Sequence, residues 1–196
     1  MSAAPAEPRD GDAPALATAG QRLGGALVDG AAVQVAGLAL SPLDQGVATA
    51  IAALAYVAYE VSFVAWRGQT LAKMALGTKV VDAATGERPT LWQAATRAVV
   101  PLAGVVVDVA LGTPGVGALW VFAVYGALLF DERRRGLHDR AAGTVVAALH
   151  RTEAHRRLGV AALVVALAVT TVSVVLALDE VDDEGPTAAP VPTASR

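Results

Sequence analysis

The sequence predicts an all-α membrane protein, a bundle of four to five transmembrane helices with a small cytoplasmic element made of a β-hairpin and a short helix. Composition is the first reason, because 55% of the 196 residues are hydrophobic and the mean hydropathy is +0.51. Charged residues make up only 17% of the chain, whereas soluble domains carry about 25%. The second reason is a set of long apolar runs, since about 20 apolar residues span a bilayer core. Cysteine is absent, which excludes disulfides and thiolate chemistry.

Residues 1–19 are predicted to form a disordered cytoplasmic arm, because they mix Ala, Pro, Asp and Glu without periodicity. They do not resemble the positive region of a signal peptide, since acidic residues outnumber Arg9. We therefore expect the first apolar run to remain in the protein as a transmembrane helix.

Four apolar regions follow this arm. The first two, residues 23–40 and 47–66, are separated by a short polar turn. The third, residues 98–130, is too long for one ordinary span and is interrupted at residues 112–115 by Gly-Thr-Pro-Gly. The last, residues 158–178, contains no charged side chain and is predicted to be an additional C-terminal span.

The third region forms either one tilted helix or a hairpin of two helices at about residues 94–111 and 115–130. Lysine and arginine are frequent in the segments on both sides of it, residues 67–93 and 131–157. The positive-inside rule places both segments in the cytoplasm, which requires an even number of crossings between them. A Pro-Gly turn suits such a reversal. Five spans result, with the N-terminus inside and a disordered acidic tail, residues 179–196, outside.

The first cytoplasmic segment is predicted to hold a short helix and a strand. The helix candidate, Gln69–Leu76, can be capped by Thr70 and ended by Gly77. Residues 78–82 are predicted to form a strand, and residues 143–146 of the later cytoplasmic segment form a second candidate. The two strands either pair into a small sheet or remain separate.

Asp29 is the most informative residue, because it lies within the first apolar run. A charge there costs roughly 2.5–3.5 kcal/mol on insertion scales, so such a residue is normally shielded and often functional. Arg22 shares its helix face about 10.5 Å away along the axis, but its side chain points away from Asp29. Asp29 therefore needs a partner from another helix, bound water or a proton. Arg97 and the arginine run at residues 133–135 are the available cations.

Other carboxylates are predicted within or beside the spans. Glu60 and Asp108 lie in apolar surroundings, and Asp139 begins a short cytoplasmic segment. One interpretation is a carboxylate pathway of Asp29, Glu60 and Asp139 that binds a sodium ion or relays protons. The alternative is a closed bundle in which Asp29 pairs with an arginine and fixes the helix register. Asp139 is expected to cap its segment and hold nearby arginines, and Arg22 is expected to snorkel toward lipid phosphates.

Several short blocks occur in a characteristic order: Arg22, Asp29, Gly68-Gln69-Thr70-Leu71-x-Lys73-x-x-x-Gly77 and Leu137-His138-Asp139-x-x-Ala142-Gly143-Thr144. Over about residues 18–150 they resemble the RDD family of bacterial membrane proteins. That family is named for one arginine and two aspartates, which map onto Arg22, Asp29 and Asp139.

The resemblance adds the polar motif residues Gln69, Thr70, Lys73 and His138 to the candidate site. Many relatives have Gly-Lys where this chain has Ala72-Lys73. The resemblance implies a multi-pass protein of the bacterial inner membrane, with transport of an unidentified ligand or, for some members, sodium/proton exchange.

Enzymatic activity is not expected, because His138 next to Asp139 lacks a nucleophile. No cofactor, resident metal or nucleic acid is expected either, and the arginines at 133–135 are predicted to contact anionic lipid headgroups. Two function classes remain. One is a small ion or solute transporter, which at this size would form a homo-oligomer or join a partner membrane protein. The other is a non-transporting scaffold that recruits partners through residues 68–90 or 131–150.

Overall fold

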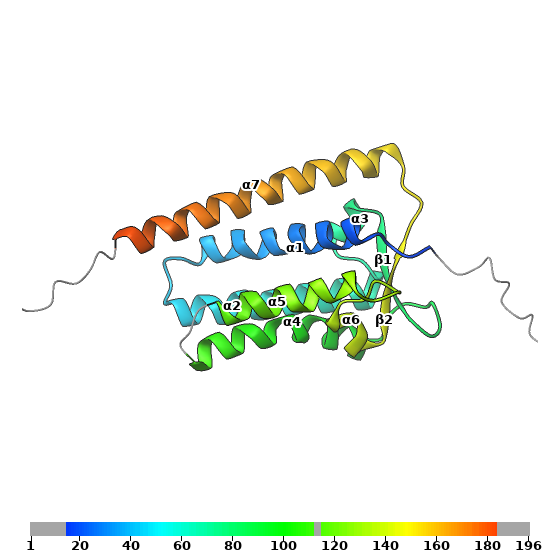
Figure 1. The fold of residues 1–196 in the computed structure, drawn as a ribbon, viewed down its shortest axis with the longest axis horizontal. Helices are drawn as coiled ribbons and strands as arrows, with labels where there is room; N and C mark the ends of the chain where they lie inside the picture. The colour runs from blue at the N-terminus through cyan, green and yellow to red at the C-terminus, as the bar shows by residue number, and fades with distance from the viewer. Residues whose placement is uncertain (1–14, 112–114, 184–196) are drawn as a thin grey trace, which may run out of the picture.

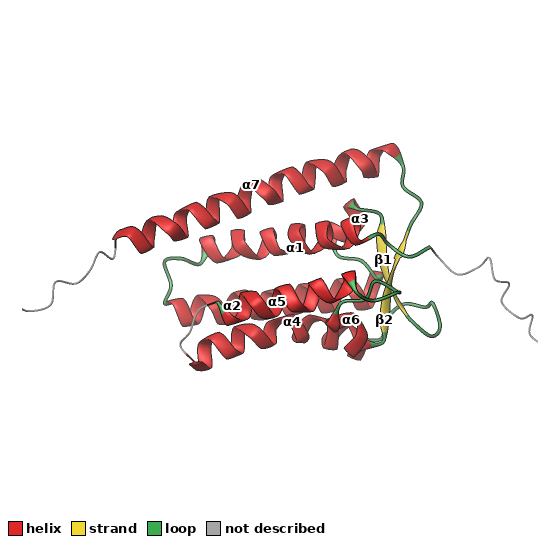
Figure 2. Ribbon diagram, viewed as in Figure 1, coloured by secondary structure: helices red, strands yellow, loops and turns green. Residues whose placement is uncertain are grey.

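The structure is a computed structural model that describes residues 15–111 and 115–183. It consists mainly of long helices lying side by side, with a two-stranded sheet across one end of the bundle (Figures 1 and 2). In chain order the elements are α1 (Ala19–Ala39), α2 (Gln45–Arg67), α3 (Leu71–Ala75), β1 (Thr78–Asp82), α4 (Leu91–Leu111), α5 (Val116–Gly126), the 3-10 helix η1 (Ala127–Leu129), α6 (Leu137–Ala142), β2 (Thr144–Ala148) and α7 (Glu153–Asp183).

Within the described residues, three helices are long and apolar enough to cross a membrane: α2, α4 and the first 23 residues of α7. A shorter apolar helix covers Val116–Leu129. Helix α1 has 21 residues but includes Arg22, Asp29 and Gln34, which lower its hydropathy. The predicted class, a mostly helical membrane protein with a small sheet, is therefore confirmed at this level.

The chain leading into α1 is part of the fold from residue 15 onward. Ala17 is fully buried, and its N–H donates to the carbonyl of Val146 in β2 at 2.9 Å. Thr18 caps α1 through a reciprocal pair of hydrogen bonds with Gln21. The predicted disordered arm, residues 1–19, is thus wrong for its last residues, because backbone pairing with β2 holds them. Residues 1–14 lie outside the described residues.

Helix α2 is tied directly to the sheet at its C-terminal end. It ends at Gly68, whose φ of 71° lies in the left-handed region. The carbonyl of Gly68 accepts from the N–H of Val80 at 2.7 Å, and a Cβ on Gly68 would lie 2.8 Å from the Val80 carbonyl oxygen. Only glycine fits this junction, which fixes β1 against the end of the bundle.

The long apolar region at residues 98–130 forms two helices, α4 and α5, instead of one tilted helix. They approach so closely that a Cβ on Gly104 would lie 2.7 Å from the Cα of Gly117. The Trp120 indole N–H donates to the Val100 carbonyl at 2.8 Å. Two closely packed helices, joined in part by the undescribed residues 112–114, match the predicted hairpin.

The two predicted strands pair antiparallel, with Val80 opposite Val146. Strand β2 starts at Thr144, one residue later than predicted, because Gly143 has a φ of 65° and ends α6. The sheet packs on the helices through a small buried core that includes Val64 and Ala94. The sheet therefore closes one end of the bundle.

The long helices form two groups. Helix α7 packs on α1 and α3, with Leu163 against Gly24 and Leu76 against Gly159, while α2 and α5 pack on α4. Helices α1 and α7 both begin at the sheet end and run in the same direction (Figure 1). Helix α7 is longer than the predicted span at both ends, and residues 184–196 of the predicted tail lie outside the described residues.

Candidate functional site

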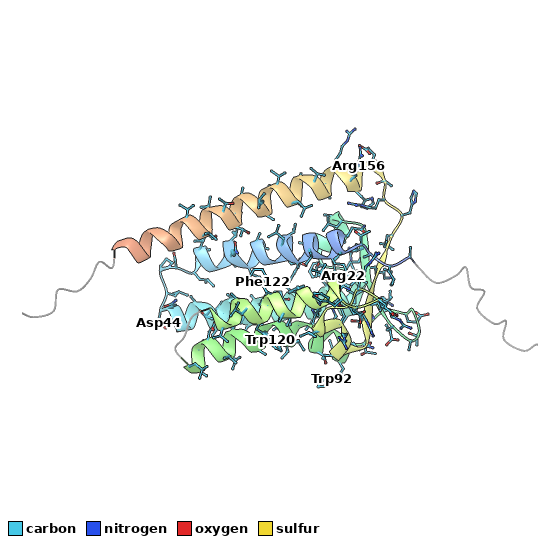
Figure 3. All side chains as sticks on the ribbon, viewed as in Figure 1. Arg22, Asp44, Trp92, Trp120, Phe122 and Arg156 are labelled. Carbon is cyan, nitrogen blue, oxygen red and sulfur yellow. The ribbon has the colours of Figure 1, made fainter. Side chains whose placement is uncertain are left out.

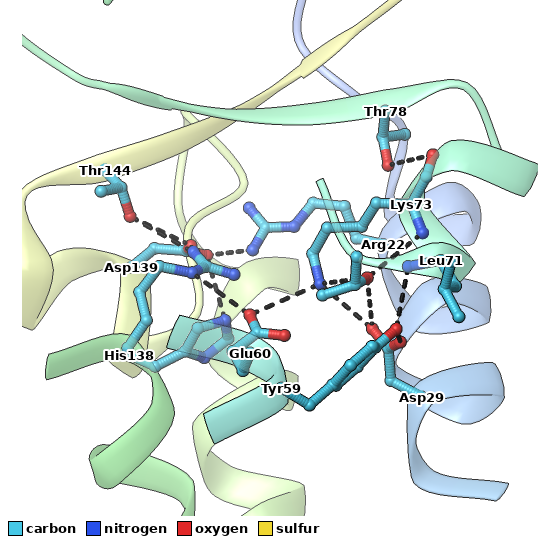
Figure 4. A network of polar contacts seen from close by, with 12 residues as sticks. Arg22, Asp29, Tyr59, Glu60, Leu71, Lys73, Thr78, His138, Asp139 and Thr144 are labelled. Carbon is cyan, nitrogen blue, oxygen red and sulfur yellow. Dashed lines mark hydrogen bonds and ion pairs between the residues drawn. The ribbon is translucent and has the colours of Figure 1, made fainter. Parts of the chain in front are cut away.

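Many side chains crowd the end of the bundle where the sheet lies (Figure 3), and charged ones form a network there (Figure 4). This charge cluster consists of Arg22 and Asp29 of α1, Glu60 of α2, Lys73 of α3, Arg97 of α4 and Asp139 of α6. It contains three cations and three carboxylates, so its formal charges cancel. Figure 4 shows Asp29 and Asp139 on opposite sides of the network, with Glu60 between them.

Asp29 is held by the short helix α3 and by α2. Its Oδ2 accepts from the Thr70 hydroxyl at 2.8 Å and lies 3.1 Å from the Lys73 ammonium. Its Oδ1 accepts from the Tyr59 hydroxyl at 3.1 Å, and that hydroxyl accepts from the Leu71 N–H at 2.8 Å. Lys73 is therefore the cation that pairs with Asp29, and not an arginine as in the closed-bundle alternative.

Lys73 and Glu60 connect the two sides of the cluster. The ammonium of Lys73 lies 3.5 Å from Glu60 Oε1, and Arg97 Nε lies 3.8 Å from the same oxygen. Burial alone lowers the pKa of Lys73, but the carboxylates of Glu60 and Asp29 raise it above its ordinary value. The resting cluster therefore holds Lys73 in its protonated form.

Asp139 is fully buried and lies at the centre of the side of the cluster opposite Asp29 (Figure 4). It pairs with the guanidinium groups of both Arg22 and Arg97, and it accepts from the Gly136 N–H at 3.0 Å. Arg22 Nη2 pairs with Asp139, and its Nη1 donates to the Arg134 carbonyl. Arg22 does not snorkel to lipid phosphates as expected, because Asp139 and this carbonyl enclose it and leave it only 9% exposed.

His138 is buried beside the cluster and is held neutral. Burial, followed by the charges of Arg97, Arg22 and Lys73, keeps its pKa well below the ordinary value for histidine. Its ring lies 4.8 Å from the Tyr125 ring, and its Nδ1 has no hydrogen-bond partner among the described residues. Within residues 15–111 and 115–183, no group of three or more His, Asp and Glu side chains is arranged to hold a metal ion.

The remaining predicted site residues lie outside the cluster. Gln69 donates to the Thr78 carbonyl at 2.8 Å and so supports β1. Asp108 accepts from the Gly117 N–H at 2.9 Å. This contact caps the N-terminus of α5, whose own N-cap residue makes no side-chain hydrogen bond. The polar network around Asp29 therefore does not include Asp108.

The predicted lipid-binding arginines differ in their surroundings. Arg135 pairs with Asp131 at 3.1 Å, and Arg134, with a φ of 52°, donates to the Ala17 carbonyl at 3.3 Å. Arg133 is exposed. Arg134 is exposed as well, whereas Arg135 is partly buried.

A cleft of about 690 Å³ lies between α1 and the α2–α4–α5 group. It runs from Ser41 and Gln45, in and beside the α1–α2 turn, to Asp29, Tyr56 and Tyr125 near the cluster. A second cavity of about 30 Å³ lies inside the cluster, with Glu60, Lys73, Arg97 and His138 in its wall. Asp29, Tyr56 and Tyr125 line both cavities. The inner cavity has room for about two waters, since a water needs roughly 10–15 Å³ by this measure.

Sequence reasoning missed the tyrosines of this site. Tyr56 and Tyr59 occur three residues apart in an otherwise apolar helix, next to Glu60. A tyrosine hydroxyl in such a helix usually needs a hydrogen-bond partner. The need for such a partner was the signal in the sequence that could have indicated these tyrosines as site residues, although it does not identify the partner.

Comparison with known proteins gives one family and one relative of note. The model of the RDD family matches residues 16–143. The Uncharacterized protein RP437 of Rickettsia prowazekii (strain Madrid E) is 37% identical over 93 residues, which cover 47% of this chain and 44% of that protein. The match thus spans less than half of that relative's length. No solved structure matches the chain.

Proposed function

The chain belongs to the RDD family, and on that premise we propose that it is a small membrane transporter that exchanges a monovalent cation, such as sodium, for a proton. Asp29 is the proposed binding carboxylate. Lys73 is the proposed proton carrier, and Glu60 is the second acid of the pathway.

The position of Asp29 is the observation that carries this proposal. Among the described residues, it is the one carboxylate that lines both the cleft and the inner cavity. A cation that entered the cleft would meet Asp29 before any other acid. Glu60 lies on the other side of Lys73 from Asp29, and it lines only the inner cavity and not the cleft.

The composition of the cluster gives the exchange a physical basis. An arriving cation would compete with Lys73 for Asp29 and give the cluster one excess positive charge. Arginine cannot lose its proton in proteins, whereas buried lysine changes its protonation readily. Lys73 is therefore the cation of the cluster that can restore neutrality by releasing a proton. One cation bound for one proton released leaves the charge unchanged.

We further propose that α1 and α5 cross the membrane together with α2, α4 and α7, which gives five spans. Exposed arginines at the sheet end, including Arg67, Arg88 and Arg140, support a cytoplasmic location of that end in a bacterial inner membrane, in line with the positive-inside rule. The N-terminus is then inside and the C-terminus outside.

The test is sodium-driven proton flux in vesicles that contain the purified protein and a trapped pH dye. We expect the wild type to acidify or alkalinise the lumen according to the direction of the sodium gradient, and Asp29→Asn to reduce the signal to that of empty vesicles. Glu132→Gln is the matched control, because Glu132 is exposed and outside the cluster. Unchanged flux in Asp29→Asn, or no flux in the wild type, would contradict the proposal.

A second candidate is a non-transporting scaffold, which the charge balance of the cluster favours. A neutral network with a fully buried Asp139 can serve as a lock that fixes the cytoplasmic sheet and α3 on the bundle. This alternative predicts a specific partner protein that co-purifies in mild detergent and is lost when exposed residues within 68–90 or 131–150 are changed. A wild type without flux but with such a partner would favour the scaffold.

A further inference from the structure

We propose that the cleft between α1 and the α2–α4–α5 group binds an amphiphilic organic cation, a primary ammonium group attached to an apolar body, with the ammonium at Asp29. This inference rests on the exchange of a monovalent cation for a proton at Asp29 that is proposed above, and it replaces sodium by an organic cation as the substrate class of that site.

The size and lining of the cleft indicate an organic ligand. Its volume of about 690 Å³ lies within the roughly 300–1,000 Å³ typical of sites for small organic molecules. The middle of its wall is apolar and comes from three helices, with Val33, Ala52 and Leu102 as examples. A bare metal ion would leave most of this apolar surface without a contact.

The inner end of the cleft is built for an ammonium group. A carboxylate offers about four acceptor positions, and Asp29 uses three of them, for Tyr59, Thr70 and Lys73. The fourth position remains for a donor that arrives through the cleft, whose wall includes Asp29. Tyr56 and Tyr125 line the same end and add hydroxyl groups.

The other end of the cleft is polar. Ser41, Gln45 and Thr49 line it next to the turn between α1 and α2. A ligand with a charged head group and an apolar body matches the order of these surroundings along the cleft, with the acid at the inner end, the apolar wall in the middle and the polar opening at the other end. Small residues such as Gly30 and Gly37 keep the α1 wall flat, and a Cβ added at either position would meet no atom within 4 Å.

Binding of the ammonium is coupled to proton release. The ligand brings one positive charge to Asp29, and the N–H bond of Lys73 breaks so that one proton passes to water at the sheet end. Lys73 remains as a neutral amine beside Glu60. The cluster then has the same net charge as before, and no redox partner is required.

The experiment measures binding of n-octylamine to the full-length protein in detergent by calorimetry, with n-octanol as the uncharged ligand of similar length. We expect octylamine to bind at least about tenfold more tightly than octanol, since a charge-assisted hydrogen bond is worth about that much. Asp29→Asn should remove this preference. Ala52→Trp should weaken octylamine binding about tenfold or more by filling the cleft, without touching the charge cluster.

Leu54→Trp is the matched control, because Leu54 lies on the same helix, is 70% exposed and is outside the cleft. Octylamine that binds Ala52→Trp and Leu54→Trp equally well would show partitioning into the detergent or the protein surface and would overturn the inference. Sodium-driven flux that persists with no octylamine binding overturns the substrate class alone. Octylamine binding that depends on Ala52 and Asp29, without sodium flux, supports the cleft site and overturns sodium exchange.

Discussion

Asp139 has more partners than any other carboxylate of the charge cluster. Two guanidinium groups, the Gly136 N–H and the Thr144 hydroxyl surround it, and none of its surface is exposed. A buried pair of this kind adds little net stability when formed, but removing one partner leaves an uncompensated charge. Asp139 therefore fixes where α1, α4 and α6 meet.

Asp139→Asn is expected to destabilise the protein by about 3–5 kcal/mol, because it leaves Arg22 and Arg97 buried without their carboxylate. Unfolding of the detergent-solubilised protein would be followed by circular dichroism. The exposed Glu132→Gln should shift stability by only about 0.5 kcal/mol or less. Equal stability of the two variants would show that the Asp139 contacts are energetically unimportant.

A second residue-scale prediction concerns His138 and acidic pH. The folded protein keeps His138 neutral, because burial and three nearby cations lower its pKa, while the unfolded chain binds a proton below pH about 6.5. The unfolded state then holds more protons than the folded state, so this contribution to stability is nearly complete at pH 7. It is lost as the pH falls through 6.5, at up to about 1.4 kcal/mol per pH unit.

His138→Phe keeps a ring against Tyr125 but cannot titrate. The difference in stability between pH 7 and pH 5.5, measured by thermal unfolding, should therefore shrink in His138→Phe. It should stay as in the wild type in His150→Phe, because His150 is exposed. The same pH dependence in both variants would disprove the role of His138.

The sequence was sufficient to select most members of the cluster but not their pairing. Asp29 and Glu60 stand out because acids are rare in apolar helices, and Asp139 and Lys73 stand out through the motif blocks. The pairing of Lys73 with Asp29 joins residues 44 positions apart. It depends on how α3, capped by Thr70, lies against α1. Sequence periodicity reports the face of one helix, and it contains no information on such a contact between elements.

At the scale of the elements, turn chemistry and charge distribution predicted the hairpin of α4 and α5. The sequence pattern also predicted two strands near β1 and β2 but left open whether they pair, and the structure shows that they do. These patterns did not predict that residues 15–17 would lie along β2, because this Ala-rich segment has no strand pattern and is held by backbone hydrogen bonds. They also did not predict which glycines make helix contacts. The closest contact, between Gly104 and Gly117, depends on the relative rotation of two helices, which the sequence pattern does not define.

Gly104→Ala is expected to destabilise the α4–α5 hairpin by about 1–3 kcal/mol, because the new Cβ would meet the backbone of Gly117 and force the helices apart. Gly126→Ala is the matched control on α5, since nothing lies within 4 Å of a Cβ at that position. The control should be neutral or stabilising by about 0.5–1 kcal/mol, as is usual for Gly→Ala in a helix. Denaturant unfolding of both variants tests this contrast, and a similar effect of the two substitutions would refute the close contact.

At the scale of the whole molecule, the charge cluster connects two groups of helices that the cleft separates elsewhere. Arg22, Asp29 and Lys73 come from the α1–α3–α7 group, and Glu60 and Arg97 come from the other group. The RDD match ends at residue 143, so α7 lies beyond it and extends the first group. The ion pair of Lys73 with Glu60 therefore joins the two groups at the sheet end, beyond the inner end of the cleft.

The last prediction is the orientation of the whole bundle. The chain contains no cysteine, so single cysteines can be introduced without removing any native one. With five spans and the sheet end inside, Ser41→Cys in the α1–α2 turn should react with a membrane-impermeant thiol reagent in intact cells. Glu87→Cys, in the exposed loop after β1, should react only after the membrane is permeabilised. Leu54→Cys, exposed in the middle of α2, should stay unlabelled in both cases, because the bilayer would cover it. Labelling of Glu87→Cys from outside, with Ser41→Cys protected, would reverse the orientation, and the cleft would then open to the cytoplasm.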